Sequence, residues 1–454
     1  MLFTSGIFWV YYFFVISLLL VNSKKFKSVN MQNIILLISS YLFYSYWDWR
    51  FLSLIFLVSL QTYICGSFIY KFYKYRNIFL NFSLIINILI LGYFKYAGFF
   101  LKELNNLLEI NTNNLDQIIL PVGISFYIFQ SFTYVLDIYK QEIEPENNPI
   151  NYFTFIAFFP QLVAGPIERA SSLLPQFKDL KTFSSKAFND GIKLIIIGLF
   201  LKVFIADNLS YDVDTIFANY QNFNNSTLFI GAFGFSIQIY GDFCGYSLIA
   251  IGIAKIMGFN LSKNFDVPYF SLTLKEFWRK WHITLSSFFR DYLYIPLGGN
   301  KKSFILRSRN LIITFLVSGL WHGANWTFIL WGVFHGFFLI LQNIFLIKIN
   351  KFLNWIFTLF IIFVLWILFR SDSINDFLAY LNILCSGLPK APETGQKIFL
   401  YSIYYLTLDI FLFKFKNNKT WFNSDVIENV LLSIMFILVI GTISGNKNFI
   451  YFQF

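Results

Sequence analysis

Apolar runs of membrane-spanning length recur along the whole chain and are separated by short polar loops. A helix needs about 20 apolar residues to cross the hydrocarbon core of a bilayer, which is roughly 30 Å thick. Runs of about this length, or a little shorter, occupy residues 6–21, 33–47, 51–70, 78–100, 118–137, 191–205, 227–256, 325–347, 352–369, 398–413 and 428–443. The pattern predicts an all-α, multi-pass membrane protein with about eleven transmembrane helices, folded as one domain over residues 1–454.

Composition and charge support this prediction. The chain is 57% hydrophobic and only 13% charged, whereas a soluble domain carries roughly 25% charged residues. A net charge of +11 would suggest a nucleic-acid partner in a soluble protein, but here the basic residues gather in loops between apolar runs. The loops after the first and third runs are basic, so the positive-inside rule places them in the cytoplasm and the N-terminus outside. No nucleic acid is expected as a partner.

Two segments depart from the simple spanning pattern. Residues 152–169 are apolar, but Pro160 and Pro166 interrupt them, and proline removes a helix hydrogen bond. This segment is predicted to be re-entrant or interfacial, because irregular backbone at membrane depth needs protein or water around it. Residues 276–292 place aromatic side chains on one helical face and basic ones on the other. They predict an amphipathic helix that lies in the interface, with His282 on its inward face.

The histidines of the chain lie close together in the sequence. His282, His322 and His335 are the only three, and imidazole is the side chain that titrates near neutral pH. The apolar run that begins after Arg309 reaches His322 in about 12 residues, or roughly 18 Å of helix, which is shorter than the hydrocarbon core. The sequence therefore predicts a half-span that turns at Gly323 and leaves His322 at membrane depth, facing a polar cavity. His335 is predicted to have a packing role.

Other polar residues of the chain have structural as well as functional explanations. Asp242 interrupts an apolar run and is predicted to face a polar interior, as a structural or cavity-lining residue more than a catalytic one. The basic residues between 275 and 309 either determine topology only or bind the phosphates of a cofactor, for which Arg279, Lys280 and Arg290 are candidates. The three cysteines have no metal-ligand spacing, no metal site is predicted, and the chain has no P-loop or nucleophile elbow.

Two sequence pieces resemble the membrane-bound O-acyltransferase (MBOAT) family: EFWRKWHITLSSFFRDYLYIPLGGN at 276–300 and SGLWHGANWTFILWGVFHG at 318–336. Supporting matches lie at 121–139, 158–169 and 238–258. The resemblance implies a catalytic core at 118–345, between N-terminal spans at 1–117 and C-terminal spans at 346–454. It also implies a ring of helices around a thinned centre, in which a cytoplasmic funnel and an extracytoplasmic one meet near His322.

The resemblance also implies roles for single residues. His322, in the Trp-His-Gly piece, would be the catalytic residue, and His282, in the Arg-Lys-Trp-His piece, would be the second important histidine. The imidazole of His322 would act either as a general base on an acceptor hydroxyl or as a transient acyl carrier. The donor would be a cytoplasmic thioester, acetyl-CoA first of all, with its phosphates on Arg279, Lys280 or Arg290.

Within the family, the chain is most similar to the bacterial branch that O-acetylates exported polysaccharides such as alginate and peptidoglycan. This implies an enzyme of the bacterial cytoplasmic membrane whose acceptor is a polysaccharide hydroxyl or a periplasmic partner acyltransferase. Two other functions stay open. One is a transporter or flippase of an acyl carrier or lipid-linked sugar, for which Asp242 would matter more than His322, although the sequence has no internal repeat. The other is a family member that acylates lipid or teichoic acid.

Overall fold

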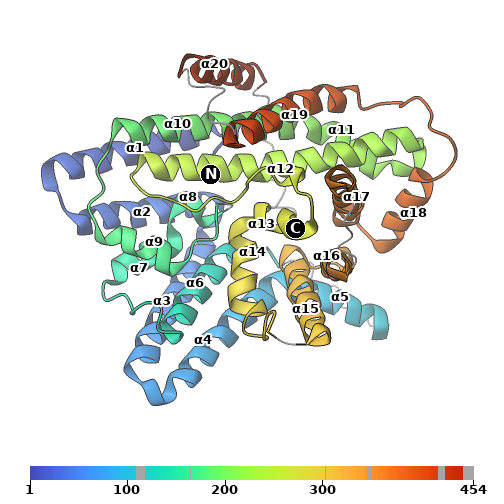
Figure 1. Cartoon of the computed structure of the whole chain (residues 1–454). Coiled ribbons are helices and arrows are strands. Elements are labelled where there is room, and N and C mark those ends of the chain that lie inside the picture. Colours follow the sequence, from blue (N-terminus) through green and yellow to red (C-terminus); the bar gives the residue numbers. More distant parts are fainter. Residues whose placement is uncertain (109–117, 164, 302, 345–349, 418–424, 443–454) are drawn as a thin grey trace. The chain divides into compact units, whose positions relative to one another are not determined.

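The computed structural model describes residues 1–108, 118–163, 165–301, 303–344, 350–417 and 425–442. All regular elements in these ranges are helices, and none is a strand (Figure 1). The chain divides into two compact units: the first comprises residues 1–195 and 247–262, and the second comprises residues 196–246 and 263–454. Helices α10 (Ser185–Leu199) and α12 (Asn225–Ile256) each continue from one unit into the other.

The first unit contains nine helices besides parts of α10 and α12, within the residues that the structure describes. They are α1 (Gly6–Val21), α2 (Val29–Asp48), α3 (Leu52–Lys71), α4 (Arg76–Leu91), α5 (Ala97–Leu108), α6 (Ile124–Tyr139), α7 (Pro149–Ala157), α8 (Phe159–Leu162) and α9 (Ala170–Leu173). The hydroxyl of Ser5 accepts a hydrogen bond from the backbone N–H of Phe8 and so caps α1. α6 is buried on nearly every side, and a Cβ at Gly66 of α3 would lie 2.5 Å from the ring of Tyr134. Helix α6 is therefore the core of this unit.

The apolar segment at 152–169 is not a single helix. α7 ends at Ala157, Phe158 leaves helical geometry with a ψ of 106°, and the short α8 carries Pro160. Because proline cannot donate the helix hydrogen bond, the break falls beside it. The predicted interruption is confirmed, and the depth of the segment in a membrane stays a prediction.

The second unit contains the remaining helices of the described chain. They are α11 (Asp207–Ala218), most of α12, α13 (Leu274–Lys280), α14 (Ile283–Phe289), α15 (Phe304–His322), α16 (Trp326–Ile344), α17 (Lys351–Arg370), α18 (Ile374–Leu384), α19 (Gln396–Asn417) and α20 (Asp425–Thr442). Two π-helical stretches also belong to it, Phe200–Ala206 and Arg290–Tyr294. α12 is the longest helix in the described ranges, with 32 residues (Figure 1).

Glycines let α12 approach the π-helical stretch that follows α10 backbone to backbone. A Cβ at Gly245 would lie 2.6 Å from the carbonyl oxygen of Gly198. This approach places the carboxylate of Asp242 2.5 Å from Nζ of Lys202, which also lies 2.7 Å from Asp207. Asp242 and Lys202 are both buried, and a buried charge requires a partner of this kind. The prediction that Asp242 faces a polar neighbour inside the protein is confirmed.

α15 and α16 form an antiparallel hairpin in which the two backbones touch. A Cβ at Gly319 would lie 2.2 Å from the carbonyl oxygen of Phe328, and a Cβ at Gly332 would lie 2.1 Å from that of Phe315. Close approach through small residues is a common way for membrane helices to pack. The hairpin therefore depends on the absence of side chains at these two positions.

α15 is longer than the apolar pattern predicted. It begins at Phe304 and contains 19 residues, which correspond to about 28 Å of helix. Arg307 and Arg309 lie inside its first two turns, because arginine favours helices and its long side chain can carry the charge out of apolar surroundings. The prediction of a half-span was wrong, and the length of this helix does not place His322 at mid-depth.

Six helical segments of the described chain are long and apolar enough to cross a membrane: Gly6–Phe26, Val29–Lys71, Tyr73–Asn105, Asn225–Ile256, Phe304–His322 and Lys351–Arg370. Shorter apolar helices cover Trp326–Gln342, Ile374–Leu384 and Glu428–Thr442. The protein is therefore an all-α, multi-pass membrane protein, as predicted. The total of about eleven spanning helices and the ring around a thinned centre stay predictions.

Candidate active site

The helix predicted at 276–292 is broken at Trp281 and His282. α13 ends at Lys280 and α14 begins at Ile283. His282 between them has a left-handed backbone with a φ of 42°, a conformation that costs a residue other than glycine about 1–3 kcal/mol. A hydrophobic period does not detect a single left-handed residue, and for this reason the prediction of one continuous amphipathic helix was wrong.

Backbone hydrogen bonds on both sides hold this α13–α14 junction. The N–H of Asp266 donates to the carbonyl of Lys280, and the N–H of Ile283 donates to the carbonyl of Asn264, both at 2.9 Å. The short segment that carries both partners therefore runs along the break. Because these bonds hold the backbone before and after His282, they stabilise its left-handed conformation and fix the direction of its side chain.

His282 is fully buried, as the pattern of the segment predicted. Its Nδ1 lies 3.0 Å from Oδ1 of Asn264, and its ring meets that of Phe243 edge to face at 4.6 Å. Its Nε2 has no hydrogen-bond partner among the described residues. Burial lowers the pKa of His282 to about 3, because apolar surroundings disfavour the charged imidazolium. His282 is therefore a neutral imidazole at physiological pH.

His322 is the last residue of α15 and is only 3% exposed. Its ring meets those of Trp331 and Phe369 almost at right angles, with centroids 5.0 and 5.4 Å away. Gly323 ends the helix in extended backbone, and a Cβ there would lie 2.2 Å from the ring of Phe328. A side chain at position 323 would therefore displace the ring of Phe328.

His335 is held in the packing of the hairpin. Nε1 of Trp278 donates a hydrogen bond to Nδ1 of His335 at 3.3 Å. The ring of His335 also meets those of Trp278 and Trp331 edge to face, at 4.9 and 4.6 Å. These contacts agree with the packing role expected for His335.

Two tryptophans connect the three histidines in one histidine cluster. Trp321 lies between His282 and His322, with ring centroids 5.8 and 5.0 Å away. Trp331 lies between His322 and His335, at 5.0 and 4.6 Å. The structure thus brings together His322 from the end of α15 and His282 from the α13–α14 junction, with one indole between them.

Sequence reasoning missed two neighbours of this cluster. Asn264 contacts His282 from a polar segment before α13, and Phe369 contacts His322 from the end of α17. Both contacts join residues that are distant in the chain, and neither residue stands in a pattern that distinguishes it locally. Only the tertiary structure reveals them.

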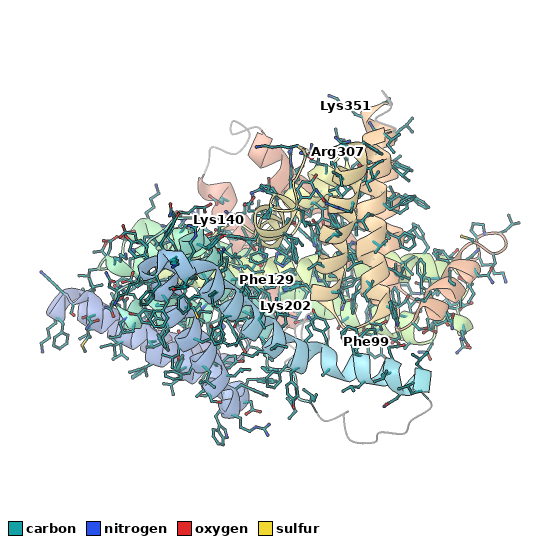
Figure 2. All side chains as sticks on the ribbon, turned by 90° about the horizontal axis from the view of Figure 1, so that it is seen from below. Phe99, Phe129, Lys140, Lys202, Arg307 and Lys351 are labelled. Carbon is teal, nitrogen blue, oxygen red and sulfur yellow. The ribbon has the colours of Figure 1, made fainter. Side chains whose placement is uncertain are left out.

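A cavity of about 560 Å³ is bounded by α13, α14, α15 and α16, and its lining includes none of the three histidines. Ser318, one helical turn before His322, lines it, and so does Trp278, the hydrogen-bond donor to His335. Figure 2 shows Arg307, another lining residue, near the end of the hairpin at which α15 begins. The lining includes four basic side chains and five hydroxyls: Lys275, Arg279, Arg290 and Arg307, and Ser286, Ser287, Tyr294, Thr314 and Ser318.

The three residues predicted to bind donor phosphates differ in their positions. Arg279 and Arg290 line the cavity, whereas Lys280 is not among its lining residues. Nζ of Lys280 lies 2.7 Å from the carboxylate of Glu276, one turn earlier in α13. Within the ranges that the structure describes, no group of three or more histidine, cysteine, aspartate or glutamate side chains is placed to hold a metal ion.

This arrangement is suited to the transfer of an acyl group by an imidazole. A neutral imidazole can accept the proton of a hydroxyl or attack an acyl carbon itself. Basic side chains in the adjoining cavity can bind an anionic donor, and the aromatic rings around His322 exclude water that would hydrolyse the acyl group.

The class of protein follows from a comparison with known families. The model of the MBOAT, membrane-bound O-acyltransferase family, matches residues 1–371. The chain belongs to this family and is an acyltransferase.

The chain is also similar to individual proteins of known name. The chain is 36% identical over 460 residues to the probable alginate O-acetylase AlgI of Pseudomonas putida, covering 93% of this chain and 94% of the relative. It is 33% identical over 490 residues to the peptidoglycan O-acetyltransferase of Helicobacter pylori, covering 92% of this chain and 91% of the relative. Identity to the teichoic acid D-alanyltransferase of Bacillus subtilis is 28% over 253 residues, or 52% of this chain and 62% of the relative.

Proposed function

We propose that the protein takes an acetyl group from a cytoplasmic thioester and passes it across the bacterial cytoplasmic membrane for O-acetylation of an extracytoplasmic polysaccharide such as peptidoglycan or alginate. The observation that carries the proposal is the position of His322, buried among aromatic rings one turn beyond a cavity with basic lining. The names of relatives that are 36% and 33% identical over more than nine tenths of the chain support the acetyl group and the class of acceptor.

The proposed donor is acetyl-CoA. Coenzyme A carries several phosphate charges at one end and its thioester at the end of a thin, amide-bearing chain. Arg279 and Arg290 would bind the phosphates, with Lys275 and Arg307 beside them in the cavity lining. The hydroxyl and aromatic groups nearer the histidine cluster would accommodate the chain, and a volume of about 560 Å³ is usual for a small-molecule site. Lys280, the third candidate, pairs with Glu276 and does not line this cavity.

In the proposed transfer, the acceptor oxygen attacks the carbonyl carbon of the thioester. His322 takes the proton of the acceptor hydroxyl, the C–S bond breaks, and the proton passes to the departing thiolate. The products are an acetyl ester and free coenzyme A. In the other form of the proposal, a ring nitrogen of His322 attacks first, and the acceptor oxygen then displaces the imidazole from the N-acetyl group. Both forms need the exclusion of water that the aromatic rings supply.

The orientation and the partner belong to the same proposal. The basic loops after the first and third apolar runs support a cytoplasmic position for those loops and an extracytoplasmic N-terminus. We propose that a periplasmic acyltransferase receives the acetyl group and completes its transfer to the polysaccharide. Acetylation of purified polysaccharide by the purified protein, without any second protein, would contradict this part.

Purified protein in lipid nanodiscs, supplied with radiolabelled acetyl-CoA, polysaccharide and a periplasmic extract that contains the partner acyltransferase, tests the proposal. The wild-type protein is expected to cleave the thioester, and His322→Ala is expected to lose this activity. The matched control is His335→Gln, which changes a buried histidine of the packing and is expected to retain it. Wild-type protein that never cleaves the thioester would favour a transporter. Label in the lipid fraction alone would favour an acyltransferase that acts on lipid.

A further inference from the structure

We infer that Asn264 holds His282 in the tautomer that carries its proton on Nδ1 and leaves a lone pair on Nε2. Asn264 is thereby a positioning residue: it determines which ring nitrogen of His282 is able to accept a proton or a hydrogen bond. The tautomer follows from the geometry alone, whereas the role of Asn264 in acetyl transfer rests on the proposed function.

The first step concerns the orientation of the Asn264 side-chain amide. Oδ1 of Asn264 lies 3.4 Å from the backbone nitrogen of Thr284 and 2.9 Å from its hydroxyl. A backbone N–H only donates, so the amide atom that faces it is the oxygen and not the NH2 group. The orientation of this amide is therefore determined by the backbone of α14.

The second step carries this orientation to the imidazole. The same Oδ1 lies 3.0 Å from Nδ1 of His282, and a carbonyl oxygen only accepts hydrogen bonds. Nδ1 must therefore carry hydrogen. A neutral imidazole has one N–H, so Nε2 carries the lone pair. This nitrogen has no hydrogen-bond partner among the described residues.

The third step concerns the charge of the ring. The rings in contact with His282 are those of Phe243, Phe265 and Trp321, and burial is the cause that lowers its pKa to about 3. The titratable residues nearest in sequence to these contacts, on the packed elements, are Asp242, Cys244, Lys263, Asp266, Lys280 and His322. Asp242 pairs with Lys202. Lys263 pairs with Asp266, and Lys280 pairs with Glu276. An uncharged amide at position 264 keeps the imidazole neutral, whereas a carboxylate there would favour its protonation.

The inference gives His282 a defined role. With the hydrogen on Nδ1 engaged by Asn264, the ring offers only a lone pair at Nε2. His282 therefore accepts a proton or a hydrogen bond from a hydroxyl, and it does not donate a hydrogen bond to the oxygen of the thioester carbonyl. The left-handed backbone at His282 and the bonds on both sides of it hold the ring in the orientation that this role requires.

Nuclear magnetic resonance of the purified protein in nanodiscs, with 15N-labelled histidine, tests the tautomer without an activity measurement. The chain has only three histidines, so a His282→Asn variant assigns the signals of His282. The expected result is a protonated Nδ1 and an unprotonated Nε2 between pH 5 and 8. A protonated Nε2 in the wild-type protein overturns the inference, whether or not the protein transfers acetyl groups.

Kinetics test the role of Asn264. Asn264→Ala is expected to lower kcat about 100-fold through loss of orientation, with little change in the KM for acetyl-CoA. Asn264→Asp keeps the acceptor oxygen and adds a charge, which is expected to raise the pKa of His282 by about 1–3 units. The acidic limb of its pH–rate profile should then move to higher pH. This isosteric variant carries the test if the alanine variant does not fold.

The matched control is Asn33→Ala. Asn33 is an equally buried asparagine whose side chain bonds Asn151 and the backbone of Phe177 in the first unit. This variant is expected to lose folded protein without any change in the pH–rate profile of the remainder. A wild-type pH–rate profile in Asn264→Asp would contradict the inference. A wild-type protein that transfers no acetyl group would contradict the proposed function, and the tautomer would still be decided by resonance.

Discussion

The α13–α14 junction and the α15–α16 hairpin each place one histidine in the cluster, and they do so by opposite means. At the junction, a left-handed His282 is held by hydrogen bonds from a separate segment. At the hairpin, His322 ends a regular helix, and glycines bring two backbones into contact. The junction depends on polar bonds and the hairpin on missing side chains. Substitutions and pH should therefore affect the two regions differently.

The largest expected effect separates the two histidines. His322→Ala is expected to lower kcat for acetyl transfer by about 10⁴-fold and His282→Ala by about 100-fold, the two ends of the usual range for proton transfer by a positioned group. The measurement is thioester cleavage by equal amounts of folded, purified variants. Equal losses in the two variants would show that His282 at the junction and His322 at the hairpin contribute alike to the reaction.

The next effect is on stability and belongs to the hairpin alone. In Gly332→Ala the new Cβ would lie 2.1 Å from a backbone oxygen of α15, and the helices must separate to admit it. Overpacking of this kind costs up to about 3 kcal/mol of unfolding free energy, which thermal unfolding in detergent would record.

Gly98 supplies the matched control for this glycine. It lies in α5, and a Cβ at this position would meet nothing within 4 Å. Gly98→Ala is expected to be neutral or slightly stabilising, because alanine favours helix over glycine. If both variants unfolded at the same temperature, the hairpin would not depend on backbone contact.

The same two regions show which parts of the structure a sequence can predict. The apolar run at 6–21 corresponds to α1 (Gly6–Val21), because burial in lipid requires an unbroken apolar helix and leaves a strong pattern. The turn after His322 was likewise predictable, since glycine favours the end of a helix. The MBOAT resemblance named both histidines from motifs that are local in the chain.

The remainder depended on contacts that no local pattern records. The break at His282 needs bonds from Asn264 and Asp266, and a hydrophobic period is the same with or without it. The sequence predicts a start for α15 that is too late, because the charges of Arg307 and Arg309 are typical of a loop, although arginine is a good helix former. Phe369 contacts His322 only through the tertiary fold.

A third effect concerns pH and belongs to the junction. The pKa of His282 is lowered from 6.5 to about 3 by burial, so the unfolded chain binds the proton more readily than the folded one. The free energy of unfolding therefore keeps its full value above pH 6.5 and decreases as the pH falls toward 3, because protonation of His282 then favours the unfolded chain. At pH 5 the loss is about 2 kcal/mol.

Thermal unfolding of wild type and of His282→Asn between pH 8 and 5 measures this loss. The variant lacks the titrating group, and its unfolding temperature is expected to fall less steeply below pH 6.5. His335→Gln provides a comparison in the hairpin. If the unfolding temperatures of wild type and His282→Asn fell in parallel with pH, His282 would not be buried in its neutral form. The two regions would then not differ in their response to pH.

The smallest effect tests the cavity that lies between the two regions. Arg290 lines it, whereas Lys280 does not and pairs with Glu276. Arg290→Gln is expected to raise the KM for acetyl-CoA several-fold, about 1 kcal/mol, because Arg290 also contacts Asp291 and its side chain is 60% exposed to water. Lys280→Gln, which removes the same charge from the adjoining helix, is expected to leave KM unchanged. The difference should shrink in high salt, where exposed charges are screened. A larger rise in KM for Lys280→Gln than for Arg290→Gln would place the donor outside this cavity. The junction would then contribute the charge of Lys280 to donor binding as well as the imidazole of His282.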